Sequence, residues 1–183
     1  MKSDTIPYPQ DKFKKNFAFL DLYSRVIKGK RANWLDIYCV SGIYVIYLQP
    51  NTQPLFTDKV NNSNLAELAS CEDLNNKWYR INLKRKSDIV YIGKGVDLKE
   101  RIRALIRFGH GKSNRHSGGE WLWQIKNLED LGLLISSCPN SQERGYEKWV
   151  IDKFLEEHNE LPLCNRKKGV NVKAWKPEYI NGY

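Results

Sequence analysis

The sequence predicts an α+β domain with extensions, on the strength of three observations. Short segments rich in β-branched and aromatic residues alternate with segments of helical periodicity, and no internal repeat is visible. A chain of 183 residues is long enough for one hydrophobic core, whereas two full domains would be cramped. The longest unbroken apolar run, Ile43 to Leu48, is far too short to span a membrane, so no membrane partner is expected.

Residues 1–40 are expected to form a helical extension. Between residues 13 and 27 apolar side chains recur at helical spacing, at Phe13, Phe17, Leu20 and Ile27. This spacing predicts an amphipathic helix that lies outside the core. The segment carries no apolar run of the kind that a secretory signal requires, and we expect a cytoplasmic protein.

A buried strand is expected over residues 42–48. This run has no polar alternation and stops before Pro50, which is typical of a strand that is covered on both faces. Residues 49–88 are richer in Asn, Lys and Asp, and we interpret them as an insertion with at most a short helix near 65–74. The β-branched and aromatic segment 88–93 predicts a second short strand.

The second half of the chain predicts three helices and one strand. Asp97, with a glutamate three residues later, is typical of a helix N-cap, and an apolar stripe follows it at Leu98, Ile102, Leu105 and Ile106. We further expect a helix over 120–129, a strand over 133–137 and a final helix over 141–159.

The charge of the chain indicates a polyanionic partner. Lys and Arg number 30 against 21 Asp and Glu, so the formal net charge is +9, and nucleic acid is the first candidate. The excess lies at the N-terminus and after residue 90, where it forms two patches. The residues expected to bind nucleic acid are Lys99, Arg103, Arg107, Lys112, Arg115, His116, Arg166, Lys167 and Lys168. The alternative is that these runs simply solvate an exposed helix face.

One carboxylate falls within the apolar stripe of the last helix. Glu147 precedes Val150, Ile151 and Phe154 at helical spacing, and burying an unpaired carboxylate is costly. A metal ion or a basic side chain is therefore expected as its partner. Two alternatives stay open: Glu147 bends outward to solvent, or Glu143, one turn earlier and expected to be more exposed, takes its place.

Five features follow one another in a specific order along the chain. The tripeptide Gly-Ile-Tyr at 42–44 lies in one predicted strand and Tyr-Ile-Gly at 91–93 in the next, followed by Arg101, Glu147 and Asn165. Taken alone, each tyrosine is by default a core aromatic residue. The ordered set, however, resembles the GIY-YIG nuclease superfamily.

The resemblance implies a particular architecture. It covers residues 42–48 and 89–166 and implies a small nuclease-like domain over 41–166, with a three-stranded antiparallel sheet flanked by helices. Residues 49–88 are then an insertion between the two motif strands, longer than in compact members, that reads substrate or mediates oligomerisation. Residues 167–183 form a basic tail.

The resemblance also implies a mechanism of phosphodiester hydrolysis with a divalent ion, Mg²⁺ or Mn²⁺, held by Glu147. Arg101 would grip the scissile phosphate and offset the charge that develops on it. Tyr44, or less favourably Tyr91, would accept the proton of the attacking water. Lys94 directly follows the second tripeptide and is expected to lower the pKa of that phenol.

Two further roles follow from the resemblance. Asn165 would position other groups rather than react. Many homing and repair members place a histidine or tyrosine shortly after the arginine, and His110 or His116 is the candidate for that role in this chain.

The function expected from these residues is that of a metal-dependent DNA endonuclease of the restriction type, acting as a homodimer if it cuts both strands of a palindrome. The alternatives are a mobile-element or DNA-repair nuclease, and a non-catalytic nucleic-acid-binding protein on the same fold. Outside these, a basic RNA-binding module could stack bases on Trp121, Trp123 and Trp149.

Overall fold

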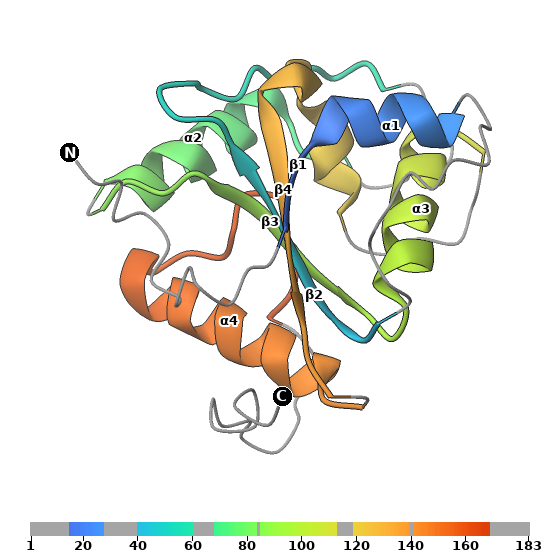
Figure 1. The fold of residues 1–183 in the computed structure, drawn as a ribbon. Coiled ribbons are helices and arrows are strands. Elements are labelled where there is room, and N and C mark those ends of the chain that lie inside the picture. Colours follow the sequence, from blue (N-terminus) through green and yellow to red (C-terminus); the bar gives the residue numbers. More distant parts are fainter. Residues whose placement is uncertain are drawn as a thin grey trace.

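The computed structural model describes residues 15–27, 40–60, 68–83, 85–112, 119–139 and 141–168. The expected α+β class is confirmed (Figure 1), and its centre is a four-stranded antiparallel sheet with the order β1-β4-β2-β3. The strands are β1 (Lys15–Ala18), β2 (Gly42–Leu48), β3 (Ile89–Gly95) and β4 (Leu131–Ser137).

The three expected strands are confirmed, and a fourth strand corrects the expected three-stranded sheet. Residues Lys15–Ala18, where helical spacing predicts part of a helix, form β1 and pair with β4, with Phe17 opposite Leu133. A strand of four residues has little local signal, and its pairing partner lies far along the chain. Tertiary pairing therefore overrides the local helical pattern here.

Helices cover both faces of the sheet. The helices are α1 (Phe19–Ile27), α2 (Cys71–Asn82), α3 (Leu98–Gly109) and α4 (Glu143–His158). In Figure 1, α1 and α3 lie together on one side of the sheet, whereas α4 packs on β2 and β3 from the other side. Within the residues described, no helix combines the length and apolar character needed to cross a bilayer.

The helix at residues 19–27 belongs to the core, contrary to the expectation that it lies outside. Phe19 and Leu22 are buried in the main hydrophobic cluster, and α1 contacts both α3 and β4. Residues 1–14 and 28–39 of the expected N-terminal extension lie outside the described residues.

The single helix expected over 120–129 is also corrected. These residues instead form two short 3-10 helices, Glu120–Gln124 and Leu128–Asp130. Between them Ile125 adopts an extended conformation and forms a β-bridge with Phe56 from the insertion. This pairing with a distant segment takes Ile125 out of helical geometry, which the local sequence pattern does not reveal.

The insertion packs tightly against the rest of the domain. The buried Gln124 side chain donates to the carbonyl oxygens of Ala69 (2.7 Å) and Thr57 (3.3 Å) and accepts from the Ala69 amide (3.1 Å). Helix α2, longer than the expected short helix and displaced toward the C-terminus, adds Leu74 and Ile81 to the core. The insertion is therefore a structural part of the domain.

Candidate active site

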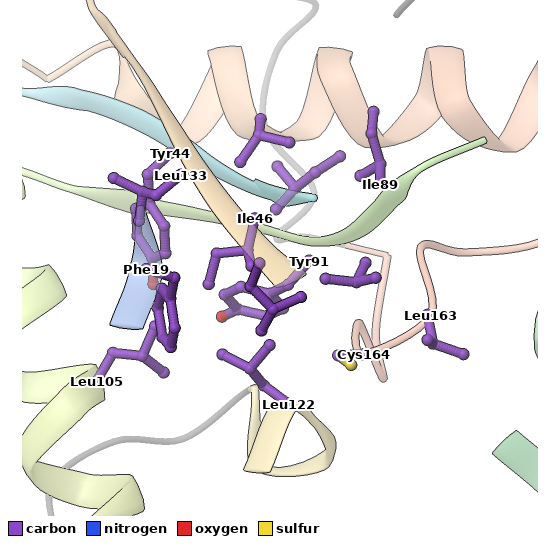
Figure 2. Packing of buried hydrophobic residues seen from close by; sticks show 14 of the residues in the cluster. Phe19, Tyr44, Ile46, Ile89, Tyr91, Leu105, Leu122, Leu133, Leu163 and Cys164 are labelled. Carbon is purple, nitrogen blue, oxygen red and sulfur yellow. The ribbon is translucent and has the colours of Figure 1, made fainter. Parts of the chain in front are cut away.

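Strand pairing brings the two tripeptides side by side. In the register of β2 and β3, Tyr44 is opposite Gly93 and Ile46 is opposite Tyr91. Because residues two apart in a strand point to the same face, Tyr44 and Tyr91 share one face of the sheet. Their ring centroids are 5.9 Å apart. Figure 2 shows both tyrosines on the side of the sheet away from α4.

Gly93 leaves the space that the Tyr44 ring occupies. A Cβ atom at residue 93 would lie 2.5 Å from both Cζ and Oη of Tyr44, far inside normal contact distance. The tyrosine ring therefore packs directly on the backbone of β3. The absence of a side chain at Gly93 sets the position of the Tyr44 hydroxyl.

Helix α3 carries Arg101 to the same end of the β2–β3 pair. The predicted cap is confirmed, since the Asp97 side chain accepts a 3.0 Å hydrogen bond from the amide of Glu100. A Cβ atom on Gly95 would lie 2.8 Å from Cβ of Arg101, so the arginine stem approaches β3 closely where the strand ends. Arg101 is thereby fixed in the first turn of the helix.

Two polar atoms of this site are buried without a partner. Among the described residues, the Tyr44 hydroxyl and the Nε of Arg101 make no hydrogen bond of normal geometry. Buried polar groups are otherwise almost always paired, and exceptions mark strain, catalysis or an additional bound group. Tyr44 is 0% exposed.

Burial dominates the electrostatics of the two tyrosines. It raises the pKa of Tyr44 to about 12, against the opposing charge of Arg101 and the neighbouring Tyr91 hydroxyl. It also raises the pKa of Tyr91 well above its usual value; Tyr44 and Glu147 add to this shift, and Arg101 opposes it. Arg101 is thus a cation that favours ionisation of both phenols.

Glu147 has the basic partner that its place in the apolar stripe predicts. Lys94 Nζ lies 2.8 Å from its Oε2, and the Glu147 side chain is 12% exposed. Burial raises the pKa of this carboxyl, while the hydrogen bond and charge of Lys94 and the charge of Arg101 lower it. The alternative that Glu147 turns outward to solvent is therefore wrong.

The expected role of Lys94 in acidifying a phenol is corrected. Successive strand residues point to opposite faces, so Lys94 points away from the face of Gly93 and Tyr91 and toward α4. Its ammonium accordingly pairs with Glu147, and Arg101 is the cation that lowers the pKa of Tyr44.

Glu143 is more buried than the expectation of an exposed residue allows. It is 5% exposed, and its Oε2 accepts a 3.1 Å hydrogen bond from the Ser41 hydroxyl. Ser41 directly precedes β2, far away in sequence, which is why helical position alone did not reveal this pairing. Glu143 raises the pKa of Glu147 and so belongs to the electrostatic surroundings of the site.

Asn165 binds the backbone of β3 with both ends of its amide. Its Nδ2 donates to the Ile92 carbonyl (2.8 Å), and its Oδ1 accepts from the Ile92 amide (2.9 Å). Ile92 lies between Tyr91 and Gly93 in the second tripeptide. The contact suits the positioning role that the resemblance implies.

Most residues of the expected nucleic-acid patches are exposed, but two of them have carboxylate partners. Arg103 lies 3.3 Å from Glu100, and Arg166 pairs with Glu120 at 2.5 Å. Among the described residues, the exposed members are Arg103, Arg107, Lys112, Lys167 and Lys168, whereas Lys99 and Arg166 are half-buried. Arg115 and His116 lie outside the described residues.

His110 does not join the tyrosine and arginine side chains. It caps the C-terminal end of α3, and its Nδ1 is 2.8 Å from the hydroxyl of Tyr23. It lies nine positions after Arg101, or about 13 Å along the helix axis. The structure therefore does not bring His110 beside Arg101, and a catalytic role for His110 or His116 stays a prediction.

The three tryptophans do not form an open stacking platform. Trp123 is buried and packs 6.0 Å from the Phe19 ring, while Trp121 and Trp149 are half-buried against the core. Their arrangement favours core packing over base stacking.

Glu147 is the residue of this site that could hold a hard divalent ion. Among the residues described, no three His, Cys, Asp or Glu side chains come together as a metal-binding group. Mg²⁺ and Mn²⁺ are commonly held by one or two carboxylates, with water and substrate phosphate completing the coordination. Because burial raises the pKa of Glu147, its ionised form gains from an additional cation. A single ion bound through Glu147 is consistent with this donor set.

One buried charge was missed by the sequence reasoning. Lys77 lies in the apolar stripe of α2, three residues after Leu74 and four before Ile81, and it is 8% exposed. Lys77 is a charged residue at an apolar helix position, which is the same sequence pattern that identifies Glu147.

Comparison with family models, curated proteins and solved structures finds no match to this chain. The described fold is a four-stranded antiparallel sheet with helices, an architecture that does not specify function. The functional interpretation consequently rests on the site residues themselves.

Proposed function

We propose that this protein is a metal-dependent DNA endonuclease of the GIY-YIG type that hydrolyses phosphodiester bonds. One observation carries the proposal: the side chains singled out by the two tripeptides and their spacing come from four elements that border the β2–β3 pair. The two tyrosines lie on one face of the pair, Lys94 and Glu147 lie on the α4 side, and the charge of Arg101 acts on both groups. We refer to these side chains as the catalytic cluster, which comprises Tyr44, Tyr91, Lys94, Arg101 and Glu147.

The electrostatic coupling of the cluster supports a catalytic purpose. The charge of Arg101 acts on the pKa values of Tyr44, Tyr91 and Glu147 together. Perturbed, mutually coupled titratable groups are characteristic of active sites. A guanidinium held at the end of a strand can grip a phosphate with a fixed fork and stabilise the charge that develops on it.

Tyr44 is the proposed proton acceptor. In hydrolysis, the water oxygen bonds to phosphorus, the bond to the leaving oxygen breaks, and the proton of the water goes to a base. With a pKa of about 12 the phenol is protonated at neutral pH, so it must first release its own proton to solvent and then accepts the proton of the water as the phenolate, which a more cationic environment favours. Arg101 and neutralisation of Glu147 both act in that direction.

Glu147 would hold the divalent ion, Mg²⁺ or Mn²⁺. When bound, such an ion supplies Lewis-acid polarisation of a phosphoryl oxygen and orients water. Lys94 Nζ already lies 2.8 Å from one oxygen of the Glu147 carboxylate. A metal ion would therefore either share this carboxylate with Lys94 or displace Lys94 from it. Asn165 keeps the backbone of β3 in place beside these groups.

DNA is the proposed substrate because the chain carries a net charge of +9 and exposed basic residues lie on α3 and directly after Asn165 and Arg166. We assign it to the restriction type because the sequence adds an N-terminal segment and an insertion to a small core and not a long separate DNA-binding tail. Such an enzyme would act as a homodimer on a short palindrome.

One observation favours a second candidate, a non-catalytic nucleic-acid-binding protein. The Lys94–Glu147 ion pair neutralises the carboxylate without a metal, and the Tyr44 hydroxyl is fully buried. A silent binder would keep DNA affinity and its dependence on salt but would never cut.

The test is direct incubation of the purified chain with supercoiled plasmid and with phage DNA, in Mg²⁺ or Mn²⁺ and in the presence of a chelator. We expect cleavage that requires the metal, and sequencing of the products should give discrete ends for a restriction-type enzyme. Scattered ends, or cleavage confined to branched or damaged DNA, would favour a mobile-element or repair enzyme. Binding without cleavage under all conditions would contradict the endonuclease proposal.

A further inference from the structure

The insertion contains a buried lysine that needs an explanation. Lys77 projects from α2 into the protein interior at 8% exposure, on the same face as the core residues Leu74 and Ile81. Lysine is almost never buried to this extent unless its ammonium is fully paired. The position of the groups that bind the Lys77 ammonium therefore indicates the role of this side chain.

All three partners lie in one loop. Nζ of Lys77 donates hydrogen bonds to the carbonyl oxygens of Pro162 (2.9 Å), Leu163 (2.9 Å) and Asn165 (3.0 Å). An ammonium has three N–H donors, so every one of them is used in this loop. The same ammonium lies 5.2 Å from the centroid of the Trp121 ring, a cation–π contact with the 3-10 segment Glu120–Gln124.

The other side of the loop covers the open edge of β3. Strand β3 is the outermost strand of the sheet, so half of its backbone groups have no neighbouring strand. The Cys164 amide donates to the Val90 carbonyl (2.7 Å), and the Asn165 side chain pairs with both backbone groups of Ile92. The loop thus substitutes for a fifth strand at this edge.

We propose that Lys77 is a positioning residue of the catalytic cluster, which fixes Asn165 on β3 and thereby couples the insertion to the second tripeptide. The proposal rests on the proposed endonuclease function for its catalytic meaning. Its structural content is a chain of contacts from α2 through the loop 162–165 to Ile92, which lies between Tyr91 and Gly93.

An apolar side chain could not replace Lys77 in this role. The loop turns three carbonyl oxygens inward toward α2, and each would lose its buried donor if the ammonium were removed. Unsatisfied buried carbonyls force the backbone to move or admit water. The first displacement is expected at Asn165, whose backbone oxygen and side-chain amide belong to the same chain of contacts.

The experiment is amide hydrogen exchange at Ile92, measured by NMR in the full chain for wild type, Lys77→Met and Lys77→Gln. Lys86→Met is the matched control, since Lys86 is an exposed lysine of the same insertion. Exchange at Leu134, a residue of the central strand β4, reports global unfolding. We expect Ile92 exchange to accelerate about tenfold more than Leu134 exchange in Lys77→Met, and less in Lys77→Gln, which retains N–H donors.

Equal acceleration at Ile92 and Leu134 in both Lys77 variants would overturn the proposal, because Lys77 would then stabilise the fold as a whole. Use of two variants means that the result does not depend on one of them folding. Cleavage kinetics form the second arm: Lys77→Met should lower kcat with little change in KM, and it should add no further loss in an Asn165→Ala background.

The two arms separate failure of the inference from failure of the proposed function. A wild-type chain that binds but does not cut DNA would refute the endonuclease function, while the exchange data would still decide whether Lys77 fixes Asn165. A wild-type chain that cuts, together with Lys77→Met of unchanged kcat, would refute the positioning role alone.

Discussion

Replacing Gly93 with alanine should displace the Tyr44 hydroxyl from the catalytic cluster. The added Cβ would lie 2.5 Å from Cζ and Oη of Tyr44 and 2.8 Å from its Cε1, where carbon atoms normally stay about 3.5 Å or more apart. The overlap is therefore about 1 Å, and the ring that must yield is 0% exposed. Overpacking of this kind costs about 1–3 kcal/mol.

The sheet supplies a matched control for this variant. Gly132 of β4 is directly opposite Tyr47 of β2, and a Cβ there would meet the Tyr47 ring in the same way. Tyr47 lies three residues after Tyr44 in β2. Gly132→Ala should consequently impose a similar clash without touching the catalytic cluster.

The assay combines thermal unfolding with plasmid cleavage, measured well below the melting temperature of each variant. Both alanine variants should lower Tm by about 2–12 °C, from the cost above and the usual scaling for a chain of this size. Only Gly93→Ala should also lose cleavage, by about 100-fold, because a misplacement near 1 Å has that effect on a reacting group. Wild-type Tm and wild-type cleavage in Gly93→Ala would refute the packing of Tyr44 on Gly93; equal cleavage losses in both variants would refute its link to catalysis.

Four further predictions concern charged residues of the site and of the proposed DNA-binding surface. Burial raises the pKa of Glu147, so cleavage should fall as pH decreases through a value above the usual carboxyl range, which a pH–rate profile of kcat/KM will locate. Because the pKa of Glu147 is higher in the folded state than in the unfolded state, the stability that Glu147 contributes is fully present below its unfolded-state pKa and is lost as the pH rises through its folded-state pKa. Glu147→Gln should therefore have a Tm no lower than that of wild type at neutral pH. A large fall in the Tm of Glu147→Gln would contradict this prediction. Arg101→Lys keeps the charge but not the planar fork, so single-turnover cleavage should fall by about 100-fold or more while Kd for DNA changes little; undiminished cleavage would remove Arg101 from the mechanism. The exposed pair Lys167 and Lys168 should contribute to phosphate binding, and changing both to Gln should reduce the slope of log Kd against log salt by about 2, whereas an unchanged slope would exclude them from the interface.

The parts of the fold that the sequence predicts well are those with strong local signals. The uninterrupted apolar run of β2 and the Asp97 cap of α3 are both confirmed, since each depends on residues adjacent in the chain. Strand β1 and the two 3-10 segments were not predicted, because each depends on a partner distant in sequence: β4 for the first and Phe56 for the second. Local periodicity carries no information on such pairings.

In the candidate site, too, the features with local sequence signals are predicted and those that depend on distant partners are not. Spacing after the second tripeptide predicts Arg101 near the end of β3, and the apolar stripe of α4 predicts a partner for Glu147. The side toward which Lys94 points follows from strand alternation and could have been predicted as well. The burial of Glu143 could not, because its partner Ser41 reaches it only through the packing of α4 on the sheet.

The central claim is that the catalytic cluster cleaves phosphodiester bonds, and Glu147 tests it most directly. The measurement is Mg²⁺-dependent cleavage of DNA by wild type and by Glu147→Ala, with DNA affinity and Tm determined on the same preparations. We expect the variant to fold and to bind DNA but no longer to cleave it. Cleavage by Glu147→Ala at the wild-type rate, from a preparation free of contaminating nuclease, would contradict the proposed function.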